Sequence, residues 1–176
     1  MADPVEILAQ LLSPQQAATL DQAGRRAWEA AARTLSAIQG SEPSVAISDA
    51  RLVMPEEVAG DYAAPHLAVP IELSTDNDQS ATAYLSLPTA AAAAYLQTEA
   101  DNPEDQEQQT LVVTSTILGQ VINALNQEVC SRSNNGLLLS FDDVLANSMP
   151  ATLEGLEDAC LYLTATLSAG RELPLT

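Results

Sequence analysis

TLVVTSTILGQVINALNQ, residues 110–127, is the stretch that decides the fold. At helical spacing its apolar residues merge into one wide face: Leu111, Val113, Ile117, Leu118, Val121, Ile122 and Leu125. A helix needs a large partner surface to bury so broad a face, and a sheet offers such a surface. The stretch therefore predicts a long helix that is largely buried against a sheet.

A narrow polar stripe runs along the same helix. Its members, at steps of four, three and four residues, are Thr116, Gln120, Asn123 and Gln127. Hydroxyls and amides in a row can hydrogen-bond a water, a phosphoryl oxygen or a partner's backbone. The same pattern is also typical of the solvated edge of a core helix. The stripe is a candidate site for which both interpretations stay open.

The composition bounds the size and the class of the protein. The 176 residues make one ordinary domain or two small fused ones, and 47% of them are hydrophobic, which is enough for a core. Acidic residues number 24 against six Arg and no Lys, so the formal net charge is −18. This charge repels phosphate backbones and anionic lipid, so we expect neither nucleic-acid binding nor electrostatic membrane docking.

The sequence also carries signals about location. No apolar run reaches the roughly 18 residues of a membrane span, and residues 1–12 lack the basic segment of a secretory signal. The two cysteines, Cys130 and Cys160, make no disulfide framework. We therefore expect a cytoplasmic protein without direct membrane insertion.

The first half of the chain begins with helices. Capping signals predict a short helix within residues 1–12 and a long one from about residue 13 to Gln39. The long helix has an apolar face and an opposite charged face that carries three of the six arginines. We expect these arginines to pair within the molecule, as Glu29 with Arg33, rather than to form a binding patch.

Strand patterns dominate the next segment. In order, the expected elements are strands over residues 44–54, 66–74 and 82–87, then a short helix over residues 89–97. Residues 56–65 are expected to form an irregular acidic loop. Pro70 lies in the middle of the second strand, which favours a sheet edge or a bulge. Residues 99–109 follow as a solvated acidic connector.

The second half repeats the order of the first. Its expected elements are the helix over residues 110–127, a turn at Asn134-Asn135-Gly136, and strands over residues 137–144, 159–168 and 173–176. A shift of 90 residues lays Thr34-Leu35-Ser36 on Ala124-Leu125-Asn126 and Ile47 on Leu137. The chain therefore reads as two copies of a helix followed by three strands.

These copies set the predicted organisation of the chain. Residues 13–98 and 110–176 are the two repeats, the connector 99–109 joins them, and residues 13–176 act as one domain. The second repeat lacks most of one strand at Thr176. From this spacing we expect the natural protein to continue beyond that residue.

Together these segments resemble the CheC/CheX/FliY phosphatase fold of bacterial chemotaxis, which the flagellar switch protein FliM shares in its middle domain. The resemblance covers about residues 13–176, and the following segments carry it: LDQAGRRAWEAAARTLSAI, LVMPEEV, SATAYLSLPTAAAAAYL and TSTILGQVINALNQEV. It implies an α+β fold in which pseudo-twofold duplicated helix–β–β–β units pack their long helices on one face of a continuous antiparallel sheet. It also implies a cytoplasmic location and a CheY-type response regulator or flagellar switch subunits as partners.

The resemblance further implies a catalytic pattern: Ser or Asp, three residues, Glu, two residues, Asn, and a downstream Pro. Matching by the Asn-Ala-Leu stretch puts Val112 at the Glu position and Ser115 at the Asn position; in the first helix these positions hold Gln22 and Arg25. Neither half keeps the Glu/Asn pair, so in this register these positions are a degenerate binding surface.

A second register gives Thr116, Gln120 and Asn123 the spacing of the pattern, although Pro150 then lies too far along the chain. Gln lacks the charge of Glu, which weakens its grip on a basic partner. We therefore expect a module that binds a response regulator or switch subunits without catalysis. The alternative is an active phosphatase of the aspartyl phosphate of CheY that uses these three residues.

The other chemical candidates are better explained by structure. His66 is the only histidine and is expected to be structural, and the cysteines have no zinc-ligand spacing. The pairs Asp76/Asp78 and Asp142/Asp143 lack the calcium-loop pattern and read as a turn and a solvated strand end. We expect no metal and no cofactor, and the sequence leaves open whether the chain forms a homodimer.

Overall fold

The computed structural model describes residues 13–62, 65–78, 80–98, 101–128, 130, 136–146, 153 and 160–176. The expected helix within residues 1–12, the turn residues Asn134 and Asn135, and Pro150 lie outside the described residues. The helices are α2 (Pro14–Gln39), α3 (Pro55–Val58), the 3₁₀ turn η1 (Ala59–Tyr62), α4 (Thr89–Leu96) and α5 (Pro103–Glu128). The strands are β1 (Ser44–Val53), β2 (His66–Ser74), β3 (Ser80–Pro88), β4 (Leu138–Phe141), β5 (Leu145–Ala146), β6 (Cys160–Ser168) and β7 (Glu172–Leu175).

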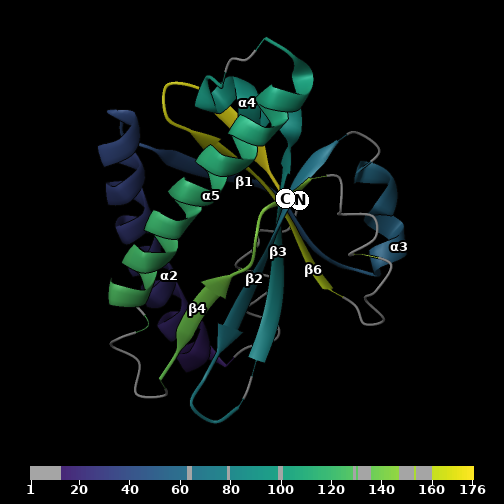
Figure 1. The fold of residues 1–176 in the computed structure, drawn as a ribbon. Coiled ribbons are helices and arrows are strands. Elements are labelled where there is room, and N and C mark those ends of the chain that lie inside the picture. Colours follow the sequence, from purple (N-terminus) through teal and green to yellow (C-terminus); the bar gives the residue numbers. More distant parts are fainter. Residues whose placement is uncertain are drawn as a thin grey trace.

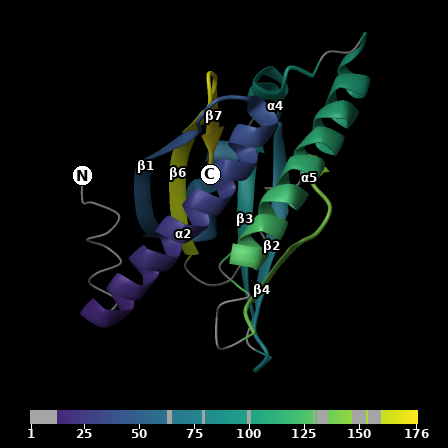
Figure 2. The same ribbon diagram turned by 90° about the vertical axis from the view of Figure 1, so that its left-hand side faces the viewer.

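The strands form two antiparallel ladders that meet at one pair of residues. One ladder has the order β1-β6-β7 and the other β3-β2-β4, with β5 also paired to β2. Ser86 of β3 and Thr176 exchange both backbone hydrogen bonds, at 2.6 and 3.0 Å, which joins the ladders. The long helices α2 and α5 lie side by side over one face of this sheet (Figure 1, Figure 2). The predicted α+β fold with long helices on an antiparallel sheet is confirmed.

The strand order has the predicted pseudo-twofold symmetry. Read through the junction, it is β1-β6-β7-β3-β2-β4, and reversing it exchanges β1 with β4, β6 with β2, and β7 with β3. Ser86 and Thr176 differ by 90 in residue number, which is the repeat distance. The two residues that join the ladders are therefore each other's equivalents, as a twofold axis between the halves requires.

A bulge in β1 explains why its sequence alternates only in part. The register passes from Ile47 opposite Ala165 to Asp49 opposite Thr164, so Ser48 is the extra residue. The Ser48 hydroxyl donates to the Thr164 carbonyl at 3.1 Å and fixes the bulge. The bulge shifts the alternation by one residue, so Ile47 before it and Ala50 after it face the same side of the sheet.

Pro70 interrupts the other ladder. β2 is not an edge strand, because it pairs with β3 on one side and with β4 and β5 on the other. On the second side, residues 69–70 lie opposite residues 142–144, which is a bulge of the kind that Pro predicts. The segment after β4 pairs with β2 again from Leu145, as β5. The break between β4 and β5 is therefore centred on Pro70.

Besides the strand expected over residues 137–144, which ends at Phe141, two segments differ from the sequence prediction. Helix α5 begins at Pro103, so most of the expected connector 99–109 is helical. Asn102 caps this helix, because its side-chain oxygen accepts the Asp105 N–H at 2.9 Å. The sequence contains the signal for this start, because Asn102 and Pro103 followed by two acidic residues are typical of the first turn of a helix.

Residues 56–65 are the second difference, since they are not an irregular loop throughout. Helix α3 starts with Pro55 in its first turn, and the Glu57 carboxylate accepts the Met54 N–H at 3.0 Å. The turn η1 continues it to Tyr62. The Tyr162 hydroxyl of β6 donates to the Asp61 carboxylate at 3.1 Å and ties η1 to the sheet.

The main core lies between the helices and the sheet. Its most buried members are Leu35, Leu67, Leu87, Ala92, Tyr95, Leu167 and Leu173. These come from α2, α4 and four strands of both ladders, so one core unites the two repeats. A smaller cluster, in which α3 and η1 contact Val53, Ala68 and Tyr162, holds these short elements on the sheet.

Two threonines of α5 are buried with different hydrogen bonding. Thr110 is fully buried and its hydroxyl lies 2.7 Å from both the Thr98 hydroxyl and the Gln106 carbonyl oxygen. Thr114 is 5% exposed, and its hydroxyl has no hydrogen-bond partner among the described residues. A buried hydroxyl without a partner costs about 1–3 kcal/mol, whereas a bonded one stabilises by roughly 1 kcal/mol.

We therefore predict opposite effects for the same substitution one helical turn apart. Thr114→Val should raise the free energy of unfolding by about 1 kcal/mol, because valine keeps the shape and removes the unpaired hydroxyl. Thr110→Val should lower it by about 1–2 kcal/mol, because two hydrogen bonds are lost. Urea titrations of both variants and the wild type measure the difference. Equal destabilisation by both variants would contradict the prediction.

Candidate functional site

The polar stripe lies on the solvent-exposed side of α5. Thr116, Gln120 and Asn123 are all exposed, as the solvated-edge interpretation and a surface site both require. The Thr116 hydroxyl donates to the Val112 carbonyl at 2.8 Å, so its proton is held by its own helix. The side-chain amides of Gln120 and Asn123 are the other polar groups of these three residues.

The other register of the family pattern falls on both long helices. Gln22 and Arg25 are exposed on α2, and Val112 of α5 is 56% exposed. Valine neither donates nor accepts a hydrogen bond, so this register has no carboxylate on α5. Ser115, at the position of the family's Asn, is half-buried and faces a hollow beside the sheet.

This hollow is the most distinctive polar feature near the motif positions. Its volume is about 540 Å³. The residues that line it are Pro70, Ser115, Phe141, Asp142, Asp143 and Leu145. It lies where the ladder is interrupted between β4 and β5, and the Asp142 N–H donates to the Pro70 carbonyl at 3.3 Å. Gln22 and Arg25 are not part of its lining.

The electrostatics of the hollow decide what it can hold. Asp142 and Asp143 are both exposed, and the Ser115 hydroxyl is the uncharged polar group of the lining. Two neighbouring carboxylates attract cationic side chains and repel phosphate. Chemically, the hollow suits lysine or arginine side chains of a partner better than it suits a phosphoryl group.

The charged face of α2 is partly used within the molecule. Arg33 lies 3.4 Å from the Glu128 carboxylate at the end of α5, with both side chains substantially exposed. The prediction of intramolecular pairing is confirmed for Arg33, although the partner is on the other helix. An ion pair this exposed contributes little to the free energy of unfolding. It is a contact between α2 and α5.

His66, Cys130 and Cys160 are the remaining candidate residues from the sequence. His66 is buried, with its ring edge-on to Tyr62 at 5.1 Å between centroids, which fits the structural role predicted for it. Cys130 and Cys160 are free, and burial raises the pKa of the Cys130 thiol. Within the described residues no three His, Cys, Asp or Glu side chains gather to hold a metal ion. In the same part of the chain, no helix is both long and apolar enough to span a bilayer.

One polar residue of α5 has a structural role that the sequence pattern did not reveal. The Asn126 amide donates to the Leu139 carbonyl at 2.8 Å and accepts the Leu139 N–H at 2.9 Å. It therefore pairs with the outer side of β4 as a further strand would, and secures a four-residue strand to the helix. The 90-residue shift places Asn126 at the position that Ser36 has in the first repeat. The longer amide side chain at this position was the signal in the sequence for the contact with β4.

Comparison with known proteins supports the fold. No model of a protein family matches the sequence, and no curated protein matches it either. FliY of Thermotoga maritima aligns with a TM-score of 0.62 at 14% identity, over 93% of this chain and 90% of that one. A chain of the FliG–FliM complex of H. pylori aligns with a TM-score of 0.60 at 13% identity, over 93% and 92%. A chain of the CheX–CheY complex of Borrelia burgdorferi aligns at 0.50 and 9% identity, over 86% and 93%.

These likenesses define the class of fold. The chain has the fold of FliY and of the FliM middle domain, as the sequence resemblance predicted. At such identities the likeness concerns the fold alone. The roles predicted for Thr116, Gln120, Asn123, Gln22, Arg25 and Ser115 stay predictions.

We predict that Asn126 and Asn123, one turn apart on α5, differ sharply in their contribution to stability. Asn126→Ala should lower the free energy of unfolding by about 1–3 kcal/mol, because it leaves the Leu139 backbone groups unpaired. Asn123→Ala, at an exposed position, should change it by less than about 0.5 kcal/mol. Thermal and urea unfolding measure both, and equal effects would show that the Asn126 amide does not secure β4.

Proposed function

We propose that this chain is a non-catalytic docking module of the chemotaxis and flagellar-switch type, which works in the cytoplasm. In this proposal it binds the basic surface of a switch subunit or of a CheY-type response regulator. The contact surface is the exposed side of α5 together with the hollow beside β4. The observation that carries the proposal is that Ser115, at a motif position, shares this hollow with Asp142 and Asp143.

The charge of the chain favours a basic partner. A net charge of −18 and two adjacent exposed carboxylates attract lysine-rich or arginine-rich surfaces and speed their encounter. Proteins with this fold occur in complexes of FliG with FliM and of CheX with CheY. Both kinds of partner are therefore candidates in this proposal.

The proposal is non-catalytic because the family chemistry lacks its groups in the matched register. The carboxylate that grips the partner is replaced by Val112 on α5 and by Gln22 on α2. The carboxamide that orients the attacking water is replaced by Ser115 and Arg25. None of these four side chains reproduces the charge or the geometry of the pair it replaces.

The test is a binding measurement with a charge-matched control. We predict that Asp142→Asn/Asp143→Asn weakens binding to a FliG-type switch protein or CheY-type regulator by about tenfold, or about 1.4 kcal/mol. Asp76→Asn/Asp78→Asn makes the same change of charge at the exposed β2–β3 turn and should leave the affinity within twofold. Calorimetry at two salt concentrations measures both. The proposal fails if neither partner binds, or if the control pair weakens binding equally.

A second candidate function is hydrolysis of the aspartyl phosphate of a CheY-type regulator. It is favoured by the exposure of Thr116, Gln120 and Asn123 along one side of α5, at the spacing of the family pattern. In this reading the amide of Asn123 orients the attacking water.

If that candidate is correct, the wild type accelerates phosphate release from a phosphorylated CheY-type protein. Gln120→Ala and Asn123→Ala should then each reduce the acceleration by about 10²-fold. Gln109→Ala, an exposed amide on the same helix, should not. Unchanged decay with the wild-type chain removes this candidate and leaves the docking proposal standing.

A further inference from the structure

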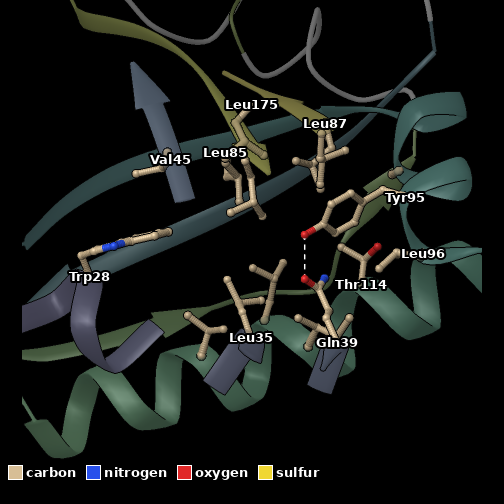
Figure 3. Close-up of a pocket in the computed structure, with 16 residues that line it drawn as sticks. Trp28, Leu35, Gln39, Val45, Leu85, Leu87, Tyr95, Leu96, Thr114 and Leu175 are labelled. Carbon is tan, nitrogen blue, oxygen red and sulfur yellow. Dashed lines mark hydrogen bonds between the residues drawn. The ribbon is translucent and has the colours of Figure 1, made fainter. Parts of the chain in front are cut away.

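An apolar cavity, partly open to solvent, lies between the helix layer and the sheet. Its volume is about 210 Å³. Its lining combines α2, α4 and α5 with strands of both repeats, and includes Trp28, Leu87, Tyr95, Thr114 and Val121. Figure 3 shows Trp28 and Val45 toward one end, with Tyr95, Gln39 and Thr114 toward the other.

The chemistry of the lining defines what can occupy the cavity. No lining residue is charged, so an ion would lose its hydration without compensation. The walls are almost wholly apolar, and a buried water needs two to four polar partners. An uncharged and mainly apolar occupant is therefore favoured over both an ion and a cluster of waters.

The polar end of the cavity holds one unused hydroxyl. The Tyr95 hydroxyl donates to the Gln39 side-chain oxygen at 2.8 Å, so these two groups satisfy each other. Burial raises the pKa of the Tyr95 hydroxyl. Thr114 lines the same cavity, is 5% exposed, and its hydroxyl makes no hydrogen bond within the described part of the chain. An occupant with a single hydrogen-bonding group would satisfy it.

The volume limits the size of this occupant. A dry engineered cavity of about 150 Å³ holds a benzene molecule. A cavity of about 210 Å³ has room for one such ring with one or two small substituents.

We propose that this cavity is a binding site for a small neutral molecule of the hydroxylated aromatic class, a simple phenol, whose hydroxyl bonds Thr114 and whose ring lies among the apolar side chains. The site is separate from the proposed docking surface, because Ser115 and the acidic residues of the hollow do not line it. Trp28 is the only tryptophan of the chain and lines the cavity, so it reports directly on occupancy.

The test uses two probes of nearly equal shape, 4-methylphenol and 1,4-dimethylbenzene, which differ by a hydroxyl in place of a methyl group. Calorimetry and Trp28 fluorescence measure their binding to the wild type and to Thr114→Val. We expect both to bind the wild type. The dissociation constant of 4-methylphenol should rise about five- to tenfold in Thr114→Val, and that of 1,4-dimethylbenzene should stay the same or fall.

Two further variants locate the site. Thr110→Val removes a buried hydroxyl of α5 that does not line the cavity, and should leave both dissociation constants within twofold. Val121→Phe fills part of the cavity and should abolish binding of both probes; circular dichroism checks that each variant is folded. The proposal is overturned if neither probe binds up to its solubility, if Thr114→Val leaves the affinity for 4-methylphenol unchanged, or if folded Val121→Phe binds as the wild type does.

Discussion

The exchange of strands between the two repeats is the constraint on which the structure depends. Strand β1 of the first repeat pairs with β6 of the second, and β4 of the second pairs with β2 of the first. Neither repeat can therefore complete a sheet broad enough to cover its own long helix. The Ser86–Thr176 pair then joins the two ladders, at the point where the pseudo-twofold axis passes. The two halves therefore complete one sheet together and share a single core.

The candidate site arises where this exchanged pairing is imperfect. Proline has no N–H for the ladder, and the chain opposite Pro70 leaves the sheet over residues 142–144 before it returns as β5. That excursion carries Asp142 and Asp143 beside Ser115 of α5 and opens the hollow. The Asn126 amide ties β4 to α5 just before the break, and Phe141 at the end of β4 lines the hollow.

The sequence predicted the features that periodicity and repetition encode, and missed those that depend on contacts between distant residues. The apolar face of residues 110–127 and the 90-residue shift predicted the long helices and the repeat, and the resemblance to the CheC/CheX/FliY fold implied the class of fold. The order of the strands within the sheet was not predicted. The start of α5 at Pro103 differs from the prediction because the acidic residues 99–109 also suit a solvated connector, whereas in the structure Asn102 caps a helix there. The hollow and the unpaired Thr114 hydroxyl could not be read from the chain, since each depends on residues from separate elements that meet only after folding.

In the proposed docking role, the charge that attracts a basic partner comes from a loop and not from the helix that carries it in the family pattern. Val112 leaves the exposed side of α5 without the negative charge that the family pattern places there, whereas Asp142 and Asp143 supply two such charges from the neighbouring loop. Because electrostatic attraction to a basic partner depends on where the charge lies, this shift would move the partner from the top of α5 toward its edge above β4. A partner held there would contact Ser115, which lines the hollow together with both carboxylates. The proposed docking role therefore does not depend on the helix carboxylate that the family's hydrolytic pattern requires.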